Sequence, residues 1–181
     1  EMKEESVIWD FIGGEPFLEI DLIDKICDYL KVEMFRRNHH WFNSYRFSFS
    51  TNGINYGTEK VQRFIQKNRQ HLSIGITIDG TKQKHDLNRI WKTRDMEKGI
   101  MPRPEEERGS YEDVVKNIPL WLEQFPNAST KVTISSADIP YIKDSVLHLY
   151  SLGIHEVNIN CVFENVWEEG DDKLFEEQLM L

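Results

Sequence analysis

The sequence predicts an α/β protein whose parallel strands curve into a partial, TIM-like (β/α) barrel. Five short segments rich in β-branched or aromatic residues are separated by amphipathic stretches, which predicts parallel strands joined by right-handed crossovers. Most of these segments alternate apolar with small polar residues, whereas central strands of a flat doubly wound sheet are apolar on both faces. The chain has 181 residues, fewer than the roughly 250 of a complete eight-stranded barrel. A partial barrel with a polar interior therefore fits best.

The strands are short and are bounded by turn residues. In the third of them, Ile74, Ile76 and Ile78 alternate with Ser73, Gly75 and Thr77, so one face is apolar and the other is polar. The predicted strands are Val7–Ile12, Tyr45–Ser50, Leu72–Ile78, Lys131–Ser135 and Glu156–Phe163.

Helices are expected where apolar residues recur at a spacing of three or four. Gly153 supplies a stop after one of them, and Asp171 is a plausible N-cap for the last, which has no stop signal. The predicted helices are Leu18–Phe35, Glu59–Asn68, Tyr111–Phe125, Ile139–Leu152 and Asp171–Leu181.

Charge and hydropathy exclude several functional classes. With 22 basic and 31 acidic side chains, the formal net charge is −9, which disfavours a general nucleic-acid binder. No apolar run approaches the roughly 20 residues of a membrane span. The first residues lead into no signal-peptide core, so we expect a cytoplasmic protein without a membrane partner.

The two cysteines, Cys27 and Cys161, form neither a disulfide framework nor a CxxC metal clip. Both fall on apolar faces, and we expect both to be buried. A cluster held by three or four thiolates cannot be built from them. His39, His40 and His85 have no accompanying carboxylate array, so structural or solvated roles are favoured over a metal site.

A distinctive motif directly follows the first strand. Gly13 and Gly14 permit close approach of the backbone to a ligand, Glu15 could hold an ammonium group, and Pro16 pre-sets the entry into a helix. An ordinary strand-to-helix turn is the competing interpretation.

Gly13-Gly14-Glu15-Pro16 resembles the GGEP motif of radical S-adenosylmethionine (SAM) enzymes, and three further segments agree in order and spacing. The pattern is closest to the SPASM-containing branch, which includes anaerobic sulfatase maturases and maturases of Cys-rich repeat peptides. The further matches are Ser50-Thr51-Asn52-Gly53 with a TNG motif, Thr77 to Arg89 with an S-x-D-G…H-D-x-x-R block, and Gly109-Ser110-Tyr111 with a GSY helix start.

The resemblance implies about five of the six strands of a radical SAM core. It also implies reductive cleavage of SAM to a 5′-deoxyadenosyl radical that modifies a peptide or protein substrate, one expected to contain cysteine. In that family a [4Fe–4S] cluster is held by a CxxxCxxC loop. We expect residues 1–181 to be a truncated core domain that lacks this loop and the SPASM domain, with helix 171–181 running into the missing part, and to be inactive as it stands.

The resemblance also assigns cofactor-binding residues, while the catalytic residues stay unknown. Gly13, Gly14 and Glu15 would hold the methionine amino group. Thr77 stands where the family has a serine, and Arg89 would meet the methionine carboxylate. Val162 would pack its backbone against adenine, and Ser50 and Asp79 are further pocket candidates. Competing interpretations are that Asp79 caps a turn and that Arg89 pairs with Asp86 on the surface.

Residues 92–108 form a charged segment with two prolines, for which a mobile solvated loop is favoured over a lid. An incomplete barrel leaves strand edges that could pair between chains. Two other functions stay open: a non-catalytic barrel module that binds SAM or a similar small molecule and has lost its cluster, and an unrelated α/β barrel in which GGEP is only a turn.

Overall fold

The computed structural model describes residues 5–91 and 108–180. It confirms the predicted strands and their order, with bounds that differ by up to two residues at each end. The strands are β1 (Val7–Phe11), β2 (Tyr45–Thr51), β3 (Leu72–Ile76), β4 (Ser129–Ile134) and β5 (Glu156–Cys161).

The helices between the strands are α1 (Ile20–Arg36), α2 (Glu59–Asn68), α3 (Lys82–Asn88), α5 (Tyr111–Val115), α6 (Ile118–Gln124), α7 (Ile142–Ser151) and α8 (Asp171–Met180). Short 3₁₀ turns are η1 (Pro16–Glu19), η2 (His40–Asn43), η3 (Arg69–His71) and η5 (Ser136–Tyr141). Two predicted helices are therefore broken: one divides into α5 and α6 just before Pro119, and the other opens with η5, which contains Pro140. Proline lacks an N–H donor, which accounts for both interruptions.

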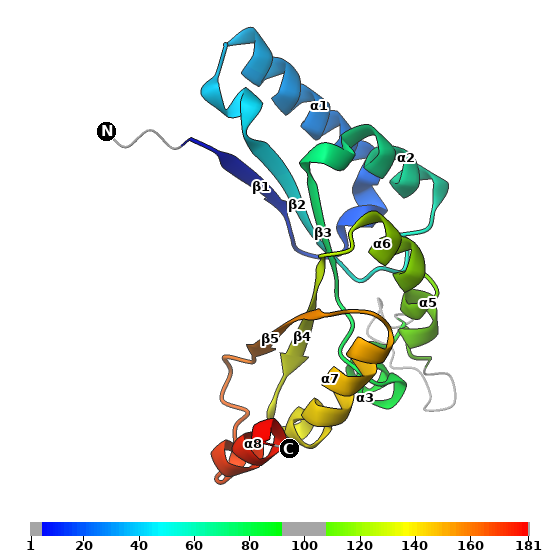
Figure 1. The fold of residues 1–181 in the computed structure, drawn as a ribbon, viewed down its shortest axis with the longest axis vertical. Helices are drawn as coiled ribbons and strands as arrows, with labels where there is room; N and C mark the ends of the chain where they lie inside the picture. Colours follow the sequence, from blue (N-terminus) through cyan, green and yellow to red (C-terminus); the bar gives the residue numbers. More distant parts are fainter. Residues whose placement is uncertain (1–4, 92–107, 181) are drawn as a thin grey trace, which may run out of the picture.

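All strand pairs are parallel, in the order β1-β2-β3 and β4-β5. A single bridge between Thr77 and Lys131 joins the two sheets. The strands thus follow one another in space as they do in sequence (Figure 1). The described strands form an open arrangement rather than a closed barrel.

The separation of β3 from β4 has a local cause. Trp121 of α6 donates its indole N–H to the carbonyl of Ile74 over 2.8 Å, at a position where a neighbouring strand could otherwise donate. Further along, the buried Thr130 hydroxyl donates to the Ile76 carbonyl (2.7 Å) and accepts from Ile78 N (3.2 Å). These side-chain bonds satisfy the β3 backbone where the ladder is missing.

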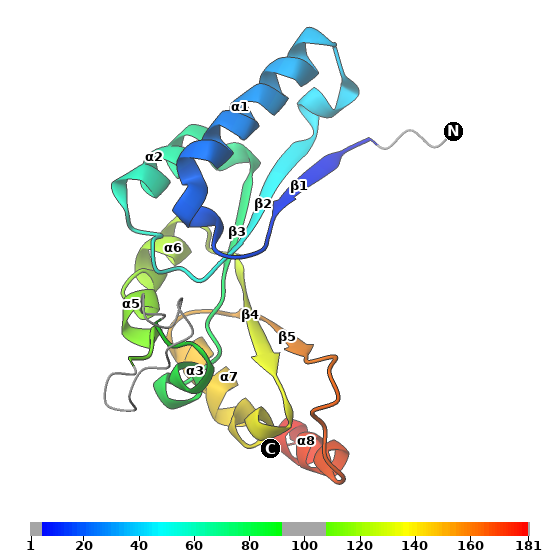
Figure 2. The ribbon, with the colours of Figure 1, turned by 180° about the vertical axis from the view of Figure 1, so that it is seen from behind.

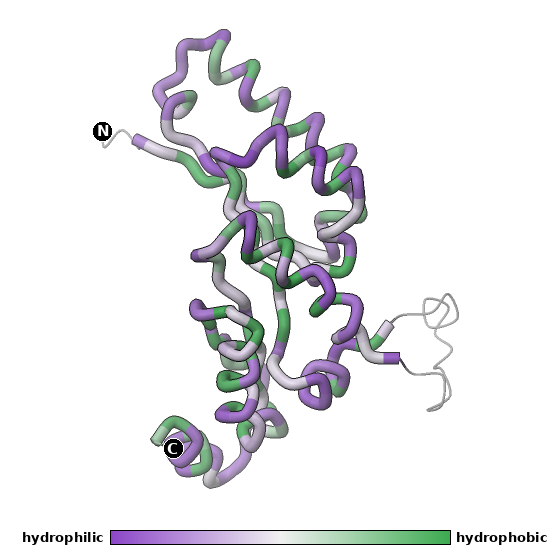
Figure 3. Tube along the Cα trace, turned by 45° about the vertical axis from the view of Figure 1, so that its right-hand side comes forward, coloured by the Kyte–Doolittle hydropathy of each residue, from purple (hydrophilic) through white to green (hydrophobic). Residues whose placement is uncertain are grey.

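Helices α1 and α2 cover one side of β1–β3, and α7 covers the same side of β4 and β5 (Figures 1 and 2). The core lies between these helices and the strands, and includes Phe47, Phe49, Ile74 and Trp121. Along the helices hydrophobic positions alternate with hydrophilic ones, as the tube in Figure 3 shows. The opposite side of the strands is open and polar, as the alternation predicted.

Burial of Cys161 was predicted and is wrong. Cys27 of α1 is fully buried, and burial raises the pKa of its thiol to about 12. Cys161 is exposed, because β5 is the outermost described strand and little packs over its carboxyl end. The predicted loop 92–108 lies outside the described residues except for Arg108. No helix among the described residues has the length and apolar character needed to cross a membrane.

Replacing Gly80 with alanine should lower the free energy of unfolding by about 1–3 kcal/mol. Gly80 has φ of +124°, and a Cβ there would collide with the side chain of the buried Ser145. Gly170 has φ of +95° and open space where a Cβ would lie, so Gly170→Ala tests backbone conformation alone. Chemical denaturation of both variants checks the prediction, and equal losses would contradict the packing argument.

Candidate functional site

The GGEP segment follows β1 and is tied to the end of β2 by Glu15. The Glu15 carboxylate accepts hydrogen bonds from Thr51 Oγ1 (2.6 Å), Asn52 N (2.7 Å) and Phe17 N (3.0 Å). A carboxylate offers about four acceptor positions, so one remains for a further donor. The bond to Phe17 N also caps the 3₁₀ turn η1. Glu15 therefore presents a fixed negative charge beside two strand ends.

Gly13 and Gly14 both have positive φ, +93° and +24°, and a Cβ added at either would meet no atom within 4 Å. Glycine adopts this backbone region without the penalty that other residues meet. The turn therefore exposes its backbone to open space directly beside Glu15.

Asp79 and Arg89 form an ion pair at the carboxyl end of β3. Arg89 Nε and Nη2 both donate to the Asp79 carboxylate, the second over 3.3 Å. Asp79 is 2% exposed and also accepts from Thr133 N of β4 (3.2 Å), whereas the Arg89 side chain is 30% exposed. The alternative pairing of Arg89 with Asp86 is not found: Asp86 accepts from Tyr111 N and Lys82. The guanidinium has five N–H donors, so some remain for a ligand.

His85 fixes the backbone around this ion pair. Its Nδ1 accepts from Asp79 N (3.2 Å), and its Nε2 lies 3.1 Å from Ser110 Oγ, which donates to the Arg89 carbonyl (2.9 Å). Because Nδ1 accepts, the consistent tautomer is neutral with the proton on Nε2. His85 is fully buried, in agreement with the structural role predicted for it.

We expect the stability of the fold to decline as pH falls from about 6.5 to about 4. Burial lowers the pKa of His85 from 6.5 to about 4, so in this window the unfolded chain takes up a proton that the folded chain excludes. The contribution is fully present above pH 6.5 and is lost on acidification. Urea unfolding at stepped pH values checks this, with His85→Asn as the comparison. A slope unchanged in that variant would contradict the assignment.

Thr77 and Ser50 lie on the open side of the strands. Thr77 N donates to the Thr51 carbonyl (2.9 Å), which places Thr77 beside the GGEP contact. Its hydroxyl has no hydrogen-bond partner among the described residues. Ser50 Oγ accepts from Nζ of Lys131 over 2.8 Å, so a lysine outside the matched motifs enters the site.

Val162 directly follows β5. Its N–H donates to the Ile134 carbonyl (3.0 Å), and its own carbonyl accepts from the Trp167 indole (3.0 Å). Both backbone groups of Val162 therefore already have hydrogen-bond partners. The half-buried residue could contact a flat ring such as adenine by van der Waals packing, but not by backbone hydrogen bonds.

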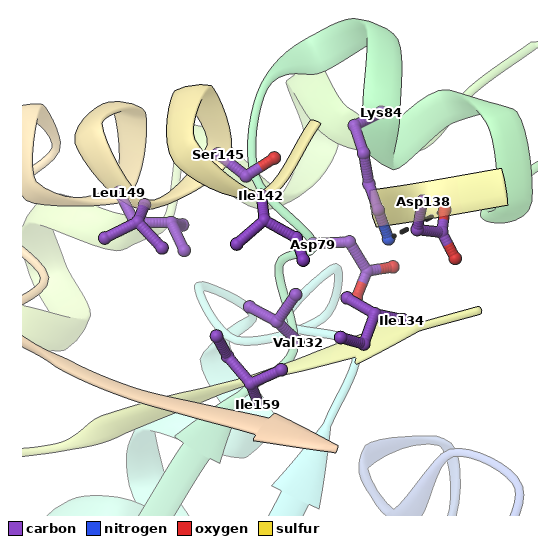
Figure 4. Close-up of a pocket in the computed structure, with 10 residues that line it drawn as sticks. Asp79, Lys84, Val132, Ile134, Asp138, Ile142, Ser145, Leu149 and Ile159 are labelled. Atoms are coloured by element: carbon purple, nitrogen blue, oxygen red, sulfur yellow. Dashed lines mark ion pairs between the residues drawn. The ribbon is translucent and has the colours of Figure 1, made fainter. Parts of the chain in front are cut away.

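A buried ion pair lies beneath the site (Figure 4). Lys84 of α3 is 1% exposed, donates to the Thr133 carbonyl (2.8 Å), and lies 3.4 Å from the Asp138 carboxylate. Asp138 also accepts from Ser135 N and from Asn88. Burial raises the pKa of Asp138, but hydrogen bonds from Ser135 and the charge of Lys84 outweigh it, so the net shift is downward. The backbone of Thr133 is therefore hydrogen-bonded on both sides: its N–H donates to Asp79, and its carbonyl accepts from Lys84.

Sequence reasoning placed the eight candidate residues at or near the carboxyl ends of strands, and the structure brings two of them, Asp79 and Arg89, into direct contact. It missed Lys84, Thr133 and Lys131 as parts of this region, whereas His85 belongs to the matched H-D-x-x-R block. A TNG motif was available to identify Thr51, and the alternation of β4 placed Lys131 and Thr133 on the polar face. No pattern marked Lys84, which lies in a short polar helix.

The side chains of the site can be compared with what the two groups implied by the resemblance, SAM and an iron–sulfur cluster, require. A carboxylate, a free hydroxyl and a partly free guanidinium, on adjacent strand ends, suit the ammonium and carboxylate of an amino acid, which is one end of SAM. An iron–sulfur cluster does not fit: the described residues include no group of three or more His, Cys, Asp or Glu side chains able to hold a metal.

No protein-family model matches the chain. Among curated proteins it is 25% identical over 153 residues to an uncharacterized protein of Methanocaldococcus jannaschii, MJ0907, covering 84% of this chain and 45% of that one. Among solved structures it is similar to native anSMEcpe with bound AdoMet and Kp18Cys peptide, with a TM-score of 0.70, 17% identity, and coverage of 98% and 46% of the two chains. Native anSMEcpe with bound AdoMet gives a TM-score of 0.70 at 18% identity.

These likenesses show the fold that the chain shares with anSMEcpe. The chain spans a little under half the length of the proteins it matches.

Proposed function

We propose that the carboxyl ends of β1–β5 form the SAM-binding part of a radical SAM enzyme. The observation that supports this best is the order of three polar groups along the chain. The Glu15 carboxylate follows β1, the free Thr77 hydroxyl follows β3, and the Arg89 guanidinium lies beyond Thr77. The amino-acid end of SAM has an ammonium and a carboxylate, so a negative and a positive group flanking a hydroxyl complement it. That anSMEcpe, which has this fold, was solved with AdoMet supports the proposal.

Each residue has a distinct part. The backbone of Gly13 and Gly14, with the free acceptor position of Glu15, binds the ammonium. Thr77 and the spare N–H groups of Arg89 bind the carboxylate, while Asp79 holds Arg89 in place. Val162 packs against the adenine, and Ser50 lines the open side of the strands, where it is bonded to Lys131.

The proposed reaction is reductive cleavage of SAM followed by modification of a peptide or protein, of the type catalysed by SPASM-containing maturases. A bound peptide in one anSMEcpe structure supports the substrate class, and a cysteine in that substrate is part of the proposal. When bound, SAM supplies the group that abstracts hydrogen. Electron delivery would require a [4Fe–4S] cluster in the whole protein, and its ligands would lie outside the described residues.

The test is formation of 5′-deoxyadenosine by the full-length protein, reconstituted anaerobically with iron and sulfide and supplied with SAM and a reductant. We expect product from the wild type and a large loss in Gly14→Val and Arg89→Met. Unchanged cleavage in both variants would contradict the pocket assignment. SAM binding without cleavage, in a protein with no CxxxCxxC sequence, would instead identify a non-catalytic binding module.

A further inference from the structure

The open side of β4 and β5 has a compact group of polar side chains, which we call the β4–β5 polar patch: Lys131, Thr133, Asn158 and Asn160. Lys131 pairs with Asn158 and Thr133 pairs with Asn160 in the parallel register. Paired residues of neighbouring strands project to the same face, and all four are exposed. The alternate residues Val132, Ile134 and Ile159 point the other way, toward α7 (Figure 4).

Within the patch, Lys131 has an unusual path. Its strand is bridged to β3 at Thr77, yet its Nζ reaches Ser50 on β2, the strand on the far side of β3. Ser50 pairs with Gly75 of β3, so this hydrogen bond links two strands that are not neighbours in the sheet. The ammonium is therefore fixed at Ser50 on the open side of the strands, although the residue remains exposed to solvent.

The charge of this ammonium is uncompensated. No carboxylate lies within ion-pair distance of Lys131 among the described residues, and its hydrogen bond goes to the neutral Ser50 hydroxyl. An ammonium has three donors, so two remain. Two carboxylates of the proposed SAM site are engaged elsewhere: Asp79 pairs with Arg89, and Glu15 accepts from Thr51 and Asn52. In a chain of net charge −9, the Lys131 ammonium has no ion-pair partner among the described residues. It is therefore suited to bind a carboxylate of a ligand.

We propose that the β4–β5 polar patch binds an acidic segment of the peptide substrate, with Lys131 bonded to an Asp or Glu carboxylate and the amides of Asn158 and Asn160 bonded to the peptide main chain. Amide side chains supply both donors and acceptors, as a peptide backbone requires, and a charged pair adds selectivity for a carboxylate over an amide. The inference rests on the proposed function for the neighbouring position of SAM, and it adds the substrate class: a peptide with a carboxylate near the modified residue.

The test uses two blocked tripeptides, Ac-Gly-Glu-Gly-NH₂ and Ac-Gly-Gln-Gly-NH₂, titrated by NMR into the full-length protein with SAM present. We expect the wild type to bind the Glu peptide about tenfold more tightly, as one charge-assisted hydrogen bond allows. Lys131→Met should abolish the preference. Lys25→Met, which removes an exposed lysine from α1 on the helix side, should retain it.

Equal affinity of the wild type for both peptides, or a preference that survives in Lys131→Met, would overturn the proposal. The dissociation constant of SAM is measured in the same samples. A loss of SAM affinity in Lys131→Met without any effect on the peptides would mean that Lys131 binds the cofactor carboxylate, and would also overturn it. Failure of the wild type to bind SAM while the Glu preference is present would refute the proposed function and leave the peptide site standing.

Discussion

Replacing Lys84 with methionine is expected to lower the free energy of unfolding by about 3–5 kcal/mol, the range for removing one partner of a buried ion pair. Lys84 is 1% exposed and Asp138 is 5% exposed, so the variant leaves a carboxylate in the interior without its cation. The Thr133 carbonyl also loses its donor at 2.8 Å. Thermal and urea unfolding of the purified variant measure the loss.

Two further variants separate charge burial from general damage. Lys82→Met removes a lysine two residues away on α3. The Lys82 side chain is 55% exposed and its pairs with Asp86 and Glu112 lie at the surface, where such pairs contribute little to stability. Lys84→Met with Asp138→Asn removes the uncompensated charge and should recover part of the stability. Equal losses in Lys82→Met and Lys84→Met would contradict the role given to burial.

Glu15→Ala should raise the dissociation constant of SAM at least roughly thirtyfold, which corresponds to about 2 kcal/mol. The substitution removes the proposed partner of the ammonium, and it also removes the acceptor that ties the GGEP turn to Thr51 and Asn52. Isothermal titration calorimetry with the reconstituted full-length protein gives the constant.

Glu19→Ala is the matched control for this variant. Glu19 is an exposed carboxylate in the same 3₁₀ turn, and its removal changes the net charge equally. We expect its affinity for SAM to equal that of the wild type. A similar weakening in both variants would show that general charge, rather than the position of Glu15, determines binding.

The strands and their faces could be predicted because their physics is local. Alternation in Phe47-Ser48-Phe49-Ser50 follows from one buried and one open face, and the structure has Phe47 and Phe49 in the core. Motif spacing placed Glu15 and Arg89 near strand ends. Cys161 shows the limit of this reasoning: apolar alternation marks the face a residue is on, but burial depends on what packs over that face.

The contacts that organise the site could not be predicted because they join segments far apart in the sequence. Lys131 meets Ser50 across 81 positions, and Lys84 meets Thr133 across 49. Neither lysine differs in local pattern from the many surface lysines of the chain. Closure of the sheet was likewise beyond prediction, since the gap between β3 and β4 depends on Trp121 and Thr130 bonding to the β3 backbone.

The most direct test of the SAM site compares SAM with decarboxylated SAM, which lacks the methionine carboxylate, by calorimetry on the wild type and on Arg89→Met. If the carboxylate meets Arg89 beside Thr77, the wild type binds SAM more tightly than the decarboxylated compound, and Arg89→Met binds the two alike. Failure of the wild type to bind SAM, or a preference that is undiminished in Arg89→Met, would contradict the placement of the cofactor at these strand ends.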